Sequence, residues 1–184
     1  MYAITALCLL DKDIRHEAAN THTVPSQIST CLTHPRVGVK LAACHCARAL
    51  TRDVAILRTT MLDTGLGKSL IKLIEKTDED PRIMTVALAC VCNIVNCYSP
   101  LRSVRFKTNQ FIIRPNIVFV QPILVPRLST LLGSEVYTVK LNALWAIKNI
   151  LYKATQEEKE EVLKEVKLET LLSLVHRCTL HRYY

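Results

Sequence analysis

Residues 141–150 read Leu-Asn-Ala-Leu-Trp-Ala-Ile-Lys-Asn-Ile and are the last of three copies of one pattern in this chain. The earlier copies lie at 40–50 and 85–95. In each copy, small or apolar residues fall at i, i+1, i+4, i+7 and i+8, which is one wide stripe on a helix of 3.6 residues per turn. Because a strand requires alternation instead, the pattern predicts three helices that each bury one face.

The copies align without a gap when Arg48, Asn93 and Asn149 are superimposed. We expect the sets of small or apolar residues that then coincide to form the core: Ala42, Ala87 and Ala143; Ala43, Leu88 and Leu144; Cys46, Val91 and Ile147; Ala49, Ile94 and Ile150; Leu50, Val95 and Leu151. The steps between copies are 45 and 56 residues. A period of about 40–47 residues is typical of solenoids built from armadillo or HEAT units.

A shorter apolar element precedes each long helix, at residues 28–32, 70–74 and 128–132. A polar break separates the two, in which Pro35 and Pro81 suit the first turn of a helix and Ser134 suits an N-cap. Farther upstream we expect short first helices at residues 53–58 and from Thr155, where Thr-Gln-Glu-Glu has the spacing of a capping box. The predicted unit is therefore short helix, helix, long helix.

These units predict an all-α fold, an armadillo-type right-handed superhelix of about three repeats with incomplete ends. The expected divisions are the end of a truncated repeat at 1–10, armadillo repeats at 11–52, 53–98 and 99–154, and a partial repeat at 155–184.

The longer second step, of 56 residues, comes from residues 103–120, which contain all three phenylalanines of the chain and neither Ala nor Leu. We expect an atypical insertion of low order there. A β-strand is the alternative, because β-branched and aromatic residues are frequent in this segment. A lone strand without a neighbour is marginally stable.

The composition suits closely packed helices, because the chain is 49% hydrophobic but only 5% aromatic and has four glycines among 184 residues. Its eight cysteines lie mostly in the helical stripes, where free cysteine behaves as a small apolar residue. Buried thiols of this kind favour the cytoplasm and nucleus over an oxidising compartment. No apolar run reaches the roughly 18 residues of a membrane span, so we expect no membrane. The net charge of +8 is compatible with an acidic partner.

Residues 141–153 resemble the third helix of an armadillo repeat, and residues 63–74 resemble its turn and second helix. Within that class the chain resembles the armadillo subunit of the GID/CTLH ubiquitin-ligase complex. The residues that carry this resemblance are His34-Pro-Arg-Val-Gly-Val-Lys-Leu-Ala-Ala-Cys44, residues 48–52, Ala87-Leu-Ala-Cys-Val-Cys-Asn-Ile-Val95, Ser99-Pro100 and residues 141–154.

The resemblance implies a non-catalytic scaffold that links a substrate receptor to the ligase core for proteasomal degradation. It implies protein partners, namely ubiquitin-ligase subunits and the substrate receptor. This chain is much shorter than members of that family, and residues 103–120 depart from their pattern.

In an armadillo solenoid the third helices line a concave groove, so residues four apart on their outer faces predict ladders for a partner. Here the ladders are Cys44, Arg48 and Arg52; Ala89, Asn93 and Cys97; Trp145, Asn149 and Lys153. The asparagine amides offer a donor and an acceptor to an extended peptide, the cations favour acidic groups, and tryptophan is frequent among binding hot spots. We therefore predict a partner-binding groove formed by Trp145, Asn149, Lys153, Asn93, Arg48 and Arg52. The alternative is that these are solvated faces, or that Trp145 fills the core.

Two other functions remain as alternatives. Trp145 and Asn149 resemble the pair with which importin-α holds basic nuclear-localisation peptides, which suggests a nuclear-transport adaptor. That role needs the pair in successive repeats, whereas Arg48 and Asn93 have no tryptophan four residues earlier, and a basic groove repels a basic peptide. A basic solenoid that binds nucleic acid rests on net charge alone, because the chain lacks an aromatic-interleaved basic patch. We do not expect nucleic acid as a partner.

Three apparent chemical motifs do not predict an enzyme. Residues 65–69, Gly-Leu-Gly-Lys-Ser, end like a phosphate-binding loop, but Leu62 stands where its first glycine is needed, so we expect a turn between helices. The Cys-x-Cys pairs at 44–46 and 90–92 point their side chains about 200° apart on a helix, which excludes zinc chelation by either pair. The histidines form no catalytic constellation, and His45 is expected to pack. We predict no enzymatic activity, no cofactor, no metal and no small-molecule substrate.

Overall fold

The computed structural model describes residues 1–21, 23–53, 56, 64–96, 124–152 and 154–180. In these ranges the chain forms ten helices and no strand, which confirms the all-α prediction: α1 (Tyr2–Leu10), α2 (Lys12–Asn20), α3 (Thr23–Leu32), α4 (Val37–Leu50), α7 (Leu66–Glu75), α8 (Pro81–Ile94), α9 (Leu124–Leu131), α10 (Tyr137–Leu151), α11 (Gln156–Val166) and α12 (Leu168–Leu180).

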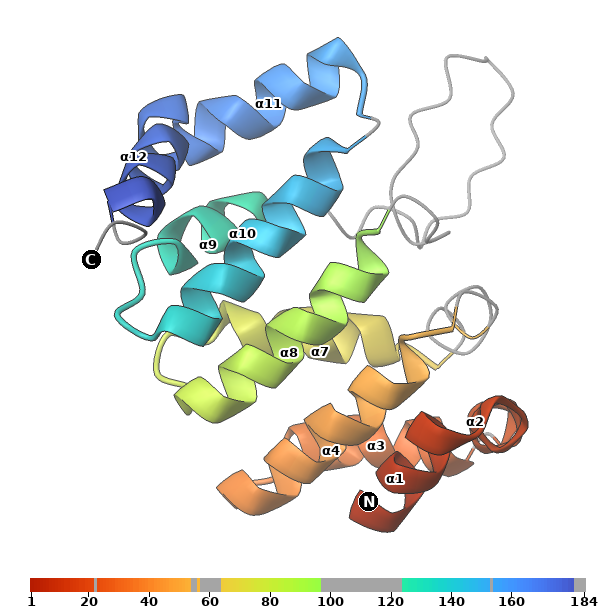
Figure 1. The fold of residues 1–184 in the computed structure, drawn as a ribbon. Coiled ribbons are helices and arrows are strands. Elements are labelled where there is room, and N and C mark those ends of the chain that lie inside the picture. The colour runs from red at the N-terminus through yellow and green to blue at the C-terminus, as the bar shows by residue number, and fades with distance from the viewer. Residues whose placement is uncertain (22, 54–55, 57–63, 97–123, 153, 181–184) are drawn as a thin grey trace.

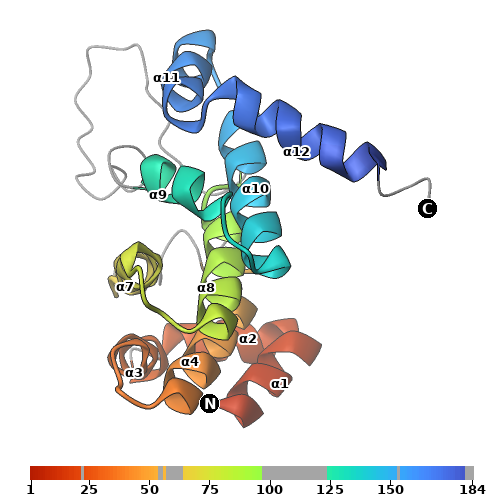
Figure 2. The same cartoon turned by 90° about the vertical axis from the view of Figure 1, so that its left-hand side faces the viewer.

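The helices are arranged in two rows. The long helices α4, α8 and α10 lie side by side, and α3, α7 and α9 form a second row behind them (Figure 1). After a quarter turn the row of α3, α7 and α9 is seen to the left of the row of α4, α8 and α10 (Figure 2). Helix α1 packs against α4 at one end of the first row, and α11 packs against α9 and α10 at the other end.

The predicted core stripe is confirmed. Every residue of three aligned sets is at most 7% exposed, namely the sets that contain Ala143, Ile147 and Ile150. Leu144 and Leu151 are only half-buried, although their partners in the two earlier helices are buried. Helix α10 buries less of its surface than α8 does, because α8 is packed between the two long helices α4 and α10.

Local capping explains where several helices begin. Asp80 caps α8 by accepting a hydrogen bond from the N–H of Arg82 at 2.8 Å, and Pro81 occupies the first helical position as predicted. The capping box that begins α11 is also confirmed, because Thr155 and Glu158 exchange side-chain to backbone bonds of 3.2 and 2.9 Å.

Two predicted helix starts are wrong. Helix α4 begins at Val37, so Pro35 lies before the helix and not in its first turn. Helix α10 begins at Tyr137, and Ser134 is not its N-cap; the Ser134 hydroxyl instead accepts a hydrogen bond from the N–H of Val136 at 3.2 Å, within the preceding turn. In both places the turn between helices is longer than the sequence pattern indicated.

Polar contacts tie neighbouring units together. Lys40 on α4 lies 2.6 and 2.7 Å from the two carboxylate oxygens of Glu79, in the loop before α8. Arg127 on α9 donates to the backbone oxygens of Ile74 and Lys76, at 2.7 and 2.6 Å, where α7 ends. The last carbonyl groups of a helix lack partners within it, so Arg127 supplies donors to the end of the preceding unit.

Several predictions fall where the structure gives no description. Residues 103–120 lie outside the described ranges, as do Cys97, Lys153 and most of the expected short helix at 53–58. The repeat divisions, the repeat count and the right-handed superhelix also stay predictions. Within the described part, none of the helices combines the length and the apolar character that crossing a bilayer requires.

Candidate partner-binding groove

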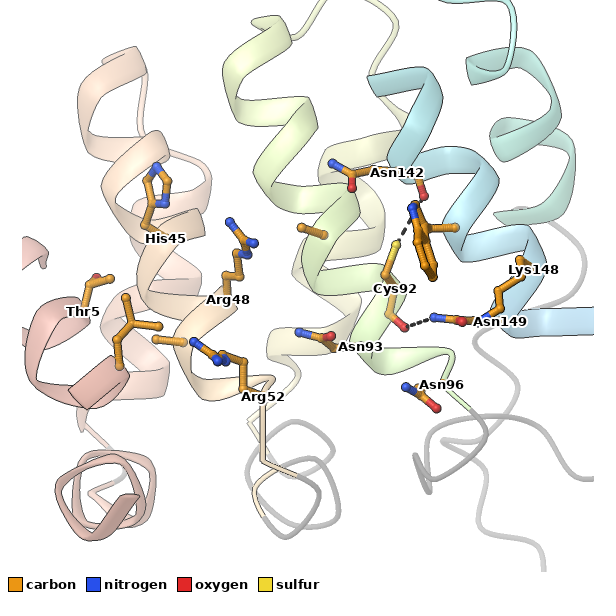
Figure 3. A pocket seen from close by; sticks show the side chains of 14 residues that line it. Thr5, His45, Arg48, Arg52, Cys92, Asn93, Asn96, Asn142, Lys148 and Asn149 are labelled. Atoms are coloured by element: carbon orange, nitrogen blue, oxygen red, sulfur yellow. Dashed lines mark hydrogen bonds between the residues drawn. The ribbon is translucent and has the colours of Figure 1, made fainter. Parts of the chain in front are cut away.

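A groove of about 680 Å³ runs across the faces of α1, α4, α8 and α10. Five of the six predicted site residues line it: Arg48, Arg52, Asn93, Trp145 and Asn149. Figure 3 shows Arg48 and Arg52 at the α4 side, Lys148 and Asn149 at the α10 side, and Asn93 on α8 between them. The sixth residue, Lys153, lies outside the described ranges. That a partner binds here stays a prediction.

Trp145 does not fill the core, which rules out one of the alternatives drawn from the sequence. Its side chain is 50% exposed and lines the groove. The ammonium of Lys148, one turn farther along α10, lies 4.9 Å from the centroid of the Trp145 ring. This distance is within the range of a cation–π interaction, so the two side chains form one amphipathic surface.

Placing Cys44 on the outer face of α4 was wrong. Its side chain is fully buried, because α4 packs against α1, α3 and α8. Burial raises the pKa of the Cys44 thiol to about 12, with the nearby Glu79 carboxylate acting in the same direction and Lys40 opposing it. The exposed ladder on α4 therefore begins at Arg48. Ala89, the equivalent residue on α8, is half-buried at the bottom of the groove.

The groove asparagines join adjacent helices. The Asn149 amide donates to the backbone oxygen of Cys92 at 3.0 Å, and the Asn93 amide donates to the Thr51 hydroxyl at 3.1 Å. Asn142, which the sequence reasoning missed, donates in the same way to the backbone oxygen of Thr85 at 3.0 Å. A carboxamide has two N–H donors and one acceptor oxygen, so each side chain retains capacity for a partner while it braces the groove wall.

The groove is basic. The described residues of its lining include the three cations Arg48, Arg52 and Lys148, each of them exposed, and no aspartate or glutamate. Burial lowers the pKa of His45 below its usual value, and the charge of Arg48 lowers it further. The lowered pKa disfavours a charge on His45, so the positive charge of the groove comes mainly from Arg48, Arg52 and Lys148.

The cysteine pairs and the glycine-rich stretch lie in the part of the chain that the structure describes. No group of three or more potential metal ligands occurs among those residues. Burial raises the pKa of Cys44 and Cys92 to about 12 and that of Cys90 well above its usual value, so these thiols are neutral. Gly65 has a φ of 69° and is the N-cap of α7, so the glycine-rich stretch begins with one left-handed residue and continues as the start of that helix.

The chain is similar to known armadillo proteins over most of its length. Residues 37–180 match the family model of the VID28/GID5 C-terminal domain. Armadillo repeat-containing protein 8 of Mus musculus is 30% identical over 169 residues, which cover 90% of this chain and 22% of the relative. GID complex subunit 5 of Schizosaccharomyces pombe is 28% identical over 174 residues, or 95% of this chain and 20% of the relative. The subunit of that name from Saccharomyces cerevisiae is 23% identical over 160 residues, or 70% and 17%. The chain thus spans about a fifth of the length of these curated relatives.

Proposed function

Because the chain belongs to the family of the VID28/GID5 C-terminal domain, we propose that it is a non-catalytic scaffold subunit of a GID/CTLH-type ubiquitin-ligase complex, acting in the cytoplasm and nucleus. Two relatives carry the name GID complex subunit 5, which supports membership in such a complex. In this proposal the chain links a substrate receptor to the ligase core, and the groove is the surface to which the receptor binds.

The observation that carries the docking role is the exposed Trp145 in a groove that crosses three long helices. A half-exposed tryptophan is costly to leave in water and is frequent at the centre of binding sites. Adjacent packed helices lie about 8–10 Å apart, so the groove from α4 to α10 extends over about 16–20 Å. An extended peptide covers that length with about five or six residues. A short linear segment of the receptor therefore fits the groove better than a folded domain.

The groove supports this role over the alternative of an importin-like adaptor. A nuclear-localisation peptide is basic, whereas Arg48, Arg52 and Lys148 give the groove a positive field, and the described residues of its lining include no carboxylate. Like charges brought together in an interface cost several kcal/mol.

The test is affinity purification from the native organism followed by mass spectrometry, with the wild-type chain, Trp145→Ala and Tyr137→Ala. Tyr137 is the matched control, because it is an aromatic residue on α10 that is 70% exposed and does not line the groove. We expect the wild type and Tyr137→Ala to recover RING-type, LisH/CTLH-motif and receptor subunits. We expect Trp145→Ala to lose the receptor and keep the ligase core. Recovery of importin-β in place of ligase subunits would refute the proposed function.

A further inference from the structure

We propose that the α4 end of the groove is an acidic-anchor subsite, in which Arg48 and Arg52 bind carboxylates of an extended segment of a partner protein. This inference rests on the proposed function of the groove as a docking surface, and it specifies the chemistry of the occupant. The bound segment has acidic side chains at one end, which contact the arginines, and its other end lies over Trp145.

The two arginines lie close together in the chain at the α4 end of the groove. Arg48 lies in the last turn of α4, and Arg52 follows directly after Thr51, the C-cap residue of that helix. Both are exposed and line the groove (Figure 3). An arginine side chain presents planar N–H donors that match the two oxygens of a carboxylate. Two such groups close together in the chain suit adjacent or alternate acidic residues of one strand.

The guanidinium groups of these two arginines have no ion-pair or hydrogen-bond partner among the described residues. Other cations there have partners: Lys40 pairs with Glu79, Arg82 lies 2.8 Å from a carboxylate oxygen of Asp80, and Arg127 donates to two carbonyls at the end of α7. Neither Arg48 nor Arg52 forms a side-chain hydrogen bond or ion pair with a residue in those ranges. Among the described residues that line the groove there is also no aspartate or glutamate to neutralise them.

The charge of Arg48 extends over the groove surface. Burial is the main cause of the lowered pKa of His45, and Arg48, one turn later on α4, lowers it further; Arg48 also opposes the effect of burial on the Cys92 thiol of α8. Because Arg48, Arg52 and Lys148 all line the groove, an anion placed in it experiences a favourable potential. Asn93, which lies between the arginines and α10, offers its remaining amide groups to the backbone of the passing strand.

The distance between the two ends of the groove determines how many residues of the bound segment separate its acidic residues from the residue at Trp145. The distance of about 16–20 Å from α4 to α10 corresponds to about five or six residues of extended chain. The occupant therefore carries its acidic residues about five or six positions from the residue that covers Trp145.

Protein chemistry fits this groove better than a nucleic acid. Single-stranded nucleic acids bind to series of aromatic side chains on which successive bases stack. The described residues of the groove lining provide one exposed aromatic side chain, Trp145, and Lys148 already lies over its ring. The basic groove thus has the electrostatics for an anion but lacks the platforms for bases.

The first experiment identifies the occupant. The full-length chain carries a photo-crosslinking amino acid at Asn96, which lines the groove just after the end of α8, and is irradiated in cells of the native organism. We expect a crosslink to a partner segment with at least two acidic residues. A crosslink to a neutral or basic segment, to nucleic acid or to a second copy of this chain would overturn the inference.

The second experiment measures the role of the arginines. A synthetic peptide of the crosslinked segment is titrated against the wild type, Arg48→Glu/Arg52→Glu and the control Lys72→Glu/Lys164→Glu, which changes the net charge equally at exposed lysines outside the groove lining. We expect the Kd of the arginine variant to rise at least tenfold and that of the control to change less than threefold. We also expect the arginine variant to bind a second peptide in which the acidic residues are replaced by lysine. Thermal melting checks that the arginine variant is folded.

The outcomes separate the two proposals. If Arg48→Glu/Arg52→Glu binds the peptide as tightly as the wild type while Trp145→Ala does not, the acidic-anchor subsite is wrong and the docking function stands. If the wild-type chain recovers no ligase subunit from cells, the proposed function fails, and the acidic-anchor subsite fails with it as a receptor-binding site.

Discussion

Replacing Lys40 with methionine is expected to destabilise the fold by about 3 kcal/mol, because it leaves a buried carboxylate without its main partner. The Lys40 ammonium lies 2.6 and 2.7 Å from the oxygens of Glu79, and the two side chains are only 12% and 4% exposed. After the substitution, Glu79 keeps the backbone N–H of Asp80 at 3.2 Å and the exposed Lys76 ammonium at 3.9 Å. These remaining contacts place the cost at the lower end of the 3–5 kcal/mol typical of a broken buried pair.

The opposite single variant is expected to cost less. In Glu79→Gln the lysine loses its counter-charge, but its long aliphatic stem lets the ammonium reach water, so we expect about 1–2 kcal/mol. The double variant Lys40→Met/Glu79→Met removes both charges and is expected to lie within about 1 kcal/mol of the wild type.

Urea unfolding followed by circular dichroism measures these differences. With an m value of about 2 kcal/mol/M, the Lys40→Met variant shifts the midpoint by about 1.5 M. Lys72→Met is the control, because Lys72 is exposed on α7 and forms no ion pair with a described residue. If Lys40→Met unfolds within about 0.3 M of the wild type, or if the double variant is less stable than both single variants, the argument from burial is refuted.

Three further predictions concern the groove wall and the core. Asn149→Ala removes the donor to a half-buried carbonyl of α8 and is expected to cost about 1–2 kcal/mol in urea unfolding, whereas Asn149→Asp at neutral pH costs more, since it presents an acceptor to that carbonyl. Arg127→Ala is expected to cost about 1–3 kcal/mol and to increase hydrogen exchange at the end of α7; unchanged exchange there contradicts the capping role. Cys44 and Cys92, with pKa values raised from 9.0 to about 12, are expected to resist iodoacetamide at pH 8 until the chain is unfolded. In the unfolded chain these thiols ionise near pH 9, whereas in the folded chain they stay protonated up to about pH 12. Their contribution to the free energy of unfolding is therefore fully present below about pH 9 and is lost as the pH rises from there toward about 12. Urea unfolding at several pH values above about 9 measures this loss, and a free energy of unfolding that does not change with pH contradicts it.

The core of the long helices could be predicted from the sequence because helical periodicity is a local property. A residue such as Ala143 or Ile147 faces the same side of its helix whatever lies around it, and the aligned copies identified that side. The burial of Cys44 could not be predicted in this way. It depends on α1 and α8, which cover that turn of α4, and no pattern within the helix reports how neighbouring helices pack.

The groove was predicted in part, and what was missed has a geometric cause. The ladders were built on a spacing of four residues, but residues three apart share a helical face as well. Asn142 and Lys148 stand three residues before and three residues after Trp145, and both line the groove. A spacing of three from Asn93 likewise gives Asn96. Counting both spacings would have found these residues from the sequence.

The position of Trp145 makes the intrinsic tryptophan fluorescence of this chain sensitive to the state of the groove. It is the one tryptophan among the 184 residues, it is half-exposed, and it lies in the groove beside a lysine ammonium. Indole emission moves to shorter wavelength when the ring leaves water and to longer wavelength when the ring becomes fully hydrated. Occupation of the groove and unfolding of the chain therefore shift the same signal in opposite directions, so an unlabelled sample distinguishes a ligand that binds at Trp145 from one that denatures the protein.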